Sequence, residues 1–143
     1  MNLSTSGKVS RLSNAVAAGQ ATTNCTSVDM KGFQAVTFIV AIGAITSTGT
    51  VTVKAQQSTD NSAFADLEGT AIAYTDADDN KLAVLEITSP QERYVRPVVI
   101  TATANGVIDS VVAVQTGSKT EPVTHSTTVL SAELHLAPAE GTA

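Results

Sequence analysis

The chain has 143 residues, enough for one β-sandwich domain, and a formal net charge of −5. This acidity argues against nucleic acid as a partner, because phosphate binding needs a basic surface. The sequence also contains no apolar run long enough to cross a bilayer, so we expect no membrane partner. Charged residues make up only 15% of the chain, against about a quarter in typical proteins, which is consistent with extensive burial against neighbouring molecules.

Residues 1–27 are rich in small and polar side chains and predict an extended N-terminal arm. Val9, Leu12 and Val16 have a spacing compatible with one helical face. Nearby glycines and polar residues disfavour a stable helix, so we expect one short helical turn at most.

The start of the chain carries Lys8 and Arg11 but no hydrophobic segment after them, which argues against a secretory signal. The single cysteine, Cys25, excludes an internal disulfide. We expect it to be a small buried side chain and not a reactive thiol. Synthesis in a reducing cytoplasm is the resulting expectation.

Residues 28–116 carry short β-branched segments separated by turn residues, which predict a single β-sandwich. The expected strands are Val28–Met30, Phe33–Ile42, Thr50–Gln57, Phe64–Leu67, Thr70–Tyr74, Leu82–Thr88, Tyr94–Thr103 and Val107–Thr116. Phe33–Ile42 has apolar residues on both faces, with Ile39 and Ala41 opposite the main apolar row. This pattern indicates a central strand, or a strand whose second face is covered by a partner. The predicted fold class is therefore all-β, a jelly-roll-like sandwich.

Asn105-Gly106 stands between two β-rich segments and is the dipeptide most typical of a two-residue hairpin turn. It predicts that residues 94–116 form a hairpin. Pro97 lies in the first expected strand and cannot donate a hydrogen bond, which places it at an edge or a bulge.

Residues 117–143 predict an acidic C-terminal tail, whereas the N-terminal arm is basic. The two segments could pair with each other, with adjacent subunits or with a partner. We expect them to become ordered on binding, through scattered apolar and basic anchors. The candidate partner-binding residues are Lys8, Val9, Arg11, Leu12, Val16, Val129, Leu130, Leu134 and Leu136.

No set of residues predicts catalysis, a metal site or a cofactor. The loop at Asp76–Asn80 offers carboxylates, but its spacing does not match the calcium-binding loop, so a solvated turn is preferred. His125 and His135 lack partners at metal-ligand spacing. Arg93 and Arg96 could bind an acidic group or discourage pairing at a strand edge, and the sequence does not choose between these roles.

Several stretches, taken in order, resemble a family of small structural proteins of tailed bacteriophages and prophages. They are Arg11–Gln20, Val53–Ser58, Asp78–Leu82, Glu92–Arg96 and Ala137–Ala143. The resemblance implies a virion component on the outer surface of the capsid: a decoration or cement protein that binds the major capsid protein and stabilises the shell. It also implies self-association, as a trimer or another homo-oligomer. The alternatives are a tail or fibre component, or a carbohydrate-binding sandwich at the virion surface.

Overall fold

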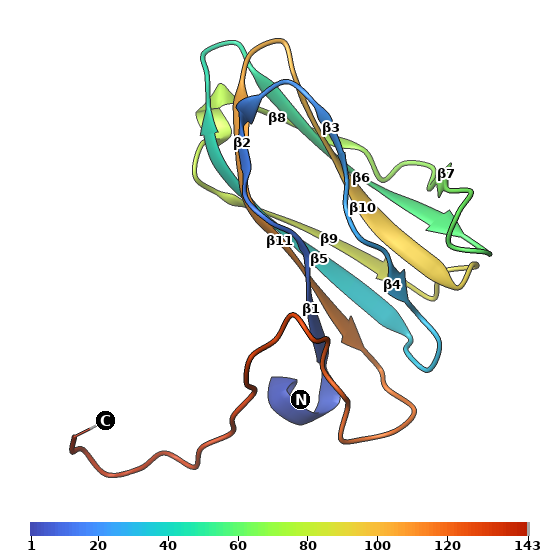
Figure 1. Cartoon of the computed structure of the whole chain (residues 1–143), viewed down its shortest axis with the longest axis vertical. Coiled ribbons are helices and arrows are strands. Elements are labelled where there is room, and N and C mark those ends of the chain that lie inside the picture. Colours follow the sequence, from blue (N-terminus) through green and yellow to red (C-terminus); the bar gives the residue numbers. More distant parts are fainter. Residues whose placement is uncertain (143) are drawn as a thin grey trace.

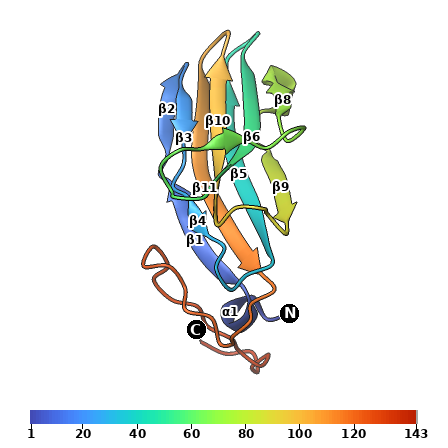
Figure 2. The ribbon, with the colours of Figure 1, turned by 90° about the vertical axis from the view of Figure 1, so that its right-hand side faces the viewer.

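The computed structural model describes residues 1–142 and shows two antiparallel sheets packed face to face (Figures 1 and 2). Sheet A has the strand order β1-β11-β5-β9, with β2 also paired to β11. Sheet B has the order β3-β10-β6-β7, with β4 paired to β10 and β8 paired to β6. The predicted all-β sandwich is confirmed.

The strands of sheet A are β1 (Lys8–Ser13), β2 (Val16–Gly19), β5 (Ala35–Ile45), β9 (Leu82–Thr88) and β11 (Gly106–Thr116). The strands of sheet B are β3 (Thr22–Asn24), β4 (Val28–Asp29), β6 (Thr50–Ser58), β7 (Ala65–Asp66), β8 (Ile72–Thr75) and β10 (Tyr94–Ala102). Two short helical turns complete the chain: α1 (Leu3–Ser6) and the 3-10 turn η1 (Asp76–Asp78).

The core between the sheets is built mainly from valine. On β6 the expected alternation holds, because Val51, Val53 and Ala55 are buried while the residues between them are partly exposed. Phe38 on β5 is fully buried beside valines of both sheets. β-branched side chains suit this geometry because they lose little freedom on the pleated surface.

The prediction that residues 1–27 form an arm outside the sandwich is wrong. β1 pairs with β11 from Lys8 opposite Gln115 onward, and β3 pairs with β10. Leu12 is only 5% exposed and belongs to the core. The inward residues of β1 recur every second position, so the helical spacing noted in the sequence was coincidental. The sandwich therefore begins at β1.

The predicted hairpin over residues 94–116 is also wrong. β10 and β11 lie in different sheets, so the segment between them crosses from sheet B to sheet A. Gly106 does not have a positive φ, whereas Thr103 does, at 68°. A Cβ atom on Gly106 would lie 3.0 Å from Cγ2 of Thr101, so close packing at the crossing, and not turn geometry, favours glycine here.

Pro97 occupies a flanked strand, because β10 has β6 on one side and β3 and β4 on the other. Val98 pairs with Asn24 and Val95 pairs with Val28. The partner segment therefore advances by four residues while β10 advances by three, which leaves one extra residue in the partner segment. The backbone carbonyl of Pro97 accepts from the Cys25 N–H at 3.2 Å on that same side. The expected bulge is thus found opposite Pro97, and the expected edge is not.

Candidate interaction surface

The outer face of sheet A carries an apolar row that no second layer of residues 1–142 covers. Val84 on β9, Ile39 on β5 and Val112 on β11 are directly paired neighbours across three strands. Val84 and the nearby Leu82 are 58% and 65% exposed, and Ile39 and Val112 are half-buried. β5 is thus the central strand predicted from its two apolar faces, and the covering of its outer face by a partner stays a prediction.

The first part of the tail, residues 123–129, lies along the outer edge of β1 and is called the proximal tail here. The N–H of Val9 donates to Nδ1 of His125 at 3.1 Å, and the N–H of Ser126 donates to the Val9 carbonyl at 3.3 Å. The N–H of Arg11 donates to Oγ1 of Thr128 at 2.9 Å. The N-terminal segment and the tail therefore do pair, through hydrogen bonds and without an ion pair among the described residues.

His125 accepts a hydrogen bond at Nδ1, so the ring nitrogen left to donate is Nε2. Nε2 lies 3.0 Å from the carbonyl oxygen of Ser4, to which it donates. His125 thereby joins α1, β1 and the tail. This role is structural, and the expectation that His125 is not a metal ligand stays a prediction.

A groove of about 440 Å³ opens where the proximal tail meets the outer face of sheet A. It is lined by Val9, Arg11, Ser110, Val112, Thr128 and Val129. Three of the predicted binding residues therefore come together at one place. The groove extends the apolar row of sheet A toward the tail.

The other predicted binding residues are dispersed. Leu12 is buried in the core, and the half-buried Val16 packs against that core. Lys8 lies with its ammonium group 6.0 Å from the centre of the Phe33 ring. The three leucines of the tail are exposed: Leu134 by 62%, and Leu130 and Leu136 almost completely. Residues 130–142 are called the distal tail. Residues 131–133 line a hollow with Leu3 and Ser4 of α1, and the chain then projects away from this end of the sandwich (Figure 1).

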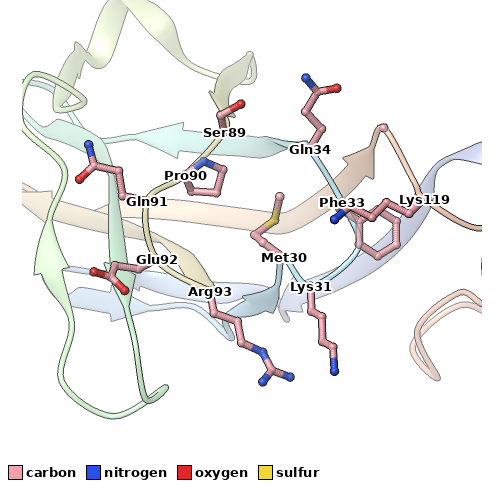
Figure 3. Close-up of a pocket in the computed structure, with 11 residues that line it drawn as sticks. Met30, Lys31, Phe33, Gln34, Ser89, Pro90, Gln91, Glu92, Arg93 and Lys119 are labelled. Atoms are coloured by element: carbon pink, nitrogen blue, oxygen red, sulfur yellow. The ribbon is translucent and has the colours of Figure 1, made fainter.

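A second groove, of about 630 Å³, lies at one end of the sandwich between the loops at residues 30–34 and 89–93, and is called the end groove (Figure 3). Its walls combine the Phe33 ring and Met30 with polar side chains, among them Gln34, Gln91 and Glu92. Sequence reasoning missed this groove because it is assembled from loops that are distant in the chain. Gly117 closes one side with a φ of +66°, where a Cβ atom would lie 2.6 Å from Cβ of Gln34.

Arg93 of the end groove is bound by an acidic group of this chain. Its Nε and Nη2 donate to the two carboxylate oxygens of Asp29 at 2.8 and 2.7 Å. These hydrogen bonds hold the pKa of Asp29 below its ordinary value. Arg96 instead donates to Gln56 and stacks on the Phe64 ring at 3.9 Å from its centre. Arg96 lies on β10 and Arg93 directly precedes it, and β10 has partner strands on both sides, so neither arginine lies at a free strand edge.

Carboxylates of the Asp76–Asn80 loop accept hydrogen bonds from backbone N–H groups. Asp79 accepts from the Ile45 N–H at 2.8 Å, and Asp76 accepts from the Thr48 N–H at 3.3 Å. Residues 1–142 bring together no group of three or more His, Cys, Asp or Glu suited to a metal ion. That the protein needs no metal or cofactor stays a prediction.

Cys25 is buried, as predicted for a structural cysteine. Burial raises the pKa of its thiol to about 11, so the nucleophilic thiolate is scarce at neutral pH. Within residues 1–142, no helix is long and apolar enough to span a membrane.

Comparison with known proteins finds similarity at the level of structure. No family model matches the chain, and no curated protein matches it. The structure is similar to that of the PBSX exported protein XepA, with a TM-score of 0.58 and 17% sequence identity. The likeness is one of fold. It covers 98% of this chain but 46% of XepA, so the chain spans about half the length of that protein.

Proposed function

We propose that this protein is a virion component that decorates the capsid and binds the major capsid protein through the outer face of sheet A. The observation that carries the proposal is the uncovered apolar row formed by Val84, Ile39 and Val112. The sequence resemblance to phage structural proteins supports it. The shared fold with an exported protein of PBSX, a prophage, supports the phage connection at a coarser level.

The physical task of a cement protein suits this surface. An open sheet face offers rigid area whose side chains lose little freedom on binding, so burial of its valines and isoleucine favours association. Stable interfaces bury about 1,200–2,000 Å² in total, and the groove beside the apolar row adds area to such a contact. Repetition of the contact around a shell multiplies a modest individual affinity. This role requires no catalysis.

Carbohydrate binding at the virion surface is the second candidate, and the end groove is the observation that favours it. Phe33 offers a ring for stacking, and Gln34, Gln91 and Glu92 offer amide and carboxylate groups beside it. Polar groups of this kind around an apolar surface are typical of small-molecule sites. A location in the phage tail or in a tail fibre is compatible with either surface.

Co-sedimentation with capsids lacking the protein tests the first candidate. Ile39→Lys places a charge at the centre of the outer face of sheet A, and Thr52→Lys places the same charge on a half-buried outward position of sheet B. We expect Ile39→Lys to lose at least about tenfold in affinity, because an interface would bury an unpaired charge, and Thr52→Lys to bind normally. Melting curves confirm that both variants are folded.

Equal binding by both folded variants and the wild type would contradict the proposed interface. If no protein form binds capsids, the decoration role itself fails. Retention on an immobilised polysaccharide would then favour the end groove.

A further inference from the structure

The distal tail has the residue pattern of a β-strand but belongs to neither sheet of the structure. From Leu130 to Leu136 the sequence reads Leu-Ser-Ala-Glu-Leu-His-Leu, in which apolar residues alternate with polar ones over seven positions. Such alternation is typical of a half-buried β-strand. In the structure this segment pairs with no strand of residues 1–142, and its three leucines face solvent.

Sheet A has one long edge to which a strand could be added. β9 is seven residues long, and no described segment pairs with its outer edge. Its outward side chains Leu82 and Val84 are exposed, and Glu86 is its one charged residue. The opposite edge, β1, is already lined by the proximal tail, and the edges of sheet B are divided among strands of two to four residues. Proteins seldom leave such a flat apolar edge unprotected.

The tail of the same molecule cannot place the whole segment Leu130–Leu136 along this edge while its proximal part stays in place. The N–H of Val129 donates to the Ser126 carbonyl at 3.0 Å, and Val129 lines the groove with Val112 of β11. β9 lies two strands beyond β11, roughly 9–10 Å away at about 4.8 Å per strand. One extended residue spans at most about 3.6 Å, and the strand pattern begins at the very next position.

We propose that residues Leu130–Leu136 of one copy add as an antiparallel strand to β9 of a second copy. In one register Leu134 lies opposite Val84 and Leu136 opposite Leu82, so that the exposed leucines extend the apolar outer face of sheet A. The backbone groups of both segments then gain hydrogen-bond partners, which is the usual chemistry of strand addition. The proposal goes beyond the capsid role and does not depend on it.

Donor and acceptor are different surfaces of the chain, so the contact is heterologous and leads to rings or longer assemblies. This property allows a complementation test in sedimentation-velocity experiments. One variant ends at Val129 and retains an intact β9. The other, Val84→Lys, retains the tail but carries a charge on the acceptor strand.

We expect the wild-type mass to rise with concentration above that of the monomer. Each variant alone should remain monomeric, and an equimolar mixture should form a one-to-one complex, because one partner supplies the tail and the other supplies β9. Thr52→Lys, on the far sheet, should associate like the wild type. His135→Lys, on the polar side of the tail pattern, should weaken association less than Leu134→Lys.

A monomeric wild-type protein, undiminished association after truncation, or a mixture that stays monomeric would each overturn the proposal. The second outcome would indicate that the tail lies over its own sheet or in solvent. Capsid binding is measured separately, so its loss alone would count against the decoration role and leave strand addition intact.

Discussion

At the scale of single residues, Gln115 shows how a polar side chain holds the two sheets together. It is 1% exposed, on an inward position of β11, and its amide donates to the backbone carbonyl of Asp29 at 2.7 Å. The same nitrogen lies 3.7 Å from the sulfur of Met30. A buried polar group is tolerated where it is hydrogen-bonded, and here its partner belongs to the opposite sheet.

We predict that Gln115→Leu lowers the free energy of unfolding by about 1–3 kcal/mol, because it leaves the partly buried carbonyl of Asp29 without this donor. Equilibrium denaturation measures the effect. Gln57→Leu is the matched control, since the buried Oε1 of Gln57 has no hydrogen-bond partner among the described residues. This control should be close to neutral, and an equal loss in both variants would show that the hydrogen bond to Asp29 contributes nothing specific.

Asp29 also predicts a pH dependence of stability. Its hydrogen bonds to Arg93 hold its pKa below the ordinary value of 3.8, so the folded state binds this proton less readily than the unfolded state. The stabilisation is therefore present above about pH 4 and is lost as pH falls through the lowered pKa. Because the pair is partly exposed, its contribution is below about 1 kcal/mol.

Melting temperatures of the wild type and Asp29→Asn, recorded from neutral pH to about pH 3, test this coupling. The wild type should be the more stable at neutral pH, and the difference should shrink in acid. Glu140→Gln, in the distal tail, should follow the wild type throughout. A constant difference between wild type and Asp29→Asn would show that the carboxylate charge is not the cause.

At the scale of elements, the proximal tail acts as an irregular cover for β1. Its three hydrogen bonds to Val9 and Arg11 use a ring nitrogen, a hydroxyl and a backbone N–H, so it protects a sheet edge without being a strand. This arrangement explains why a segment rich in Thr and Ser is ordered beside the sandwich.

We predict that a chain ending at Pro122 is less stable than a chain ending at Val129. Each hydrogen bond contributes about 0.5–1.5 kcal/mol net of the water it replaces, and the conformational entropy lost by residues 123–129 offsets part of the sum, so the difference should be about 1–3 kcal/mol. Denaturation curves of the two truncations isolate residues 123–129. The chain ending at Val129 should be as stable as the full chain. Equal stability of the two truncations would mean that the contacts of residues 123–129 with β1 contribute nothing to the free energy of unfolding.

At the scale of the whole molecule, the two sheets differ in how their edges and outer faces are used. Sheet B has short, divided edges, and the Phe64 ring stacks on Arg96 of its central strand β10. Sheet A has an open apolar face and an open edge at β9. The proposals for capsid binding and for strand addition therefore both concern sheet A, through its face and its edge respectively.

The strands within the middle of the chain were predictable because their signal is local. Thr50–Gln57 and Leu82–Thr88 were expected nearly as β6 and β9 are found, since an alternation of period two identifies a strand from its own residues. The apolar second face of β5 was visible in the same way, through Ile39 and Ala41. The strands β1, β2 and β3 were missed because segments of three to six residues carry too little alternation.

The sequence alone determined that the chain is all-β, which segments are extended and which of their faces are apolar, because these properties follow from neighbouring residues. Only the tertiary structure decided which strands are neighbours. Asn105-Gly106 joins two sheets because β10 and β11 each find partners elsewhere, and Lys8 pairs with Gln115 from the far end of the domain. Such pairings depend on burial shared by distant segments, so no local pattern specifies them, nor the grooves that they create.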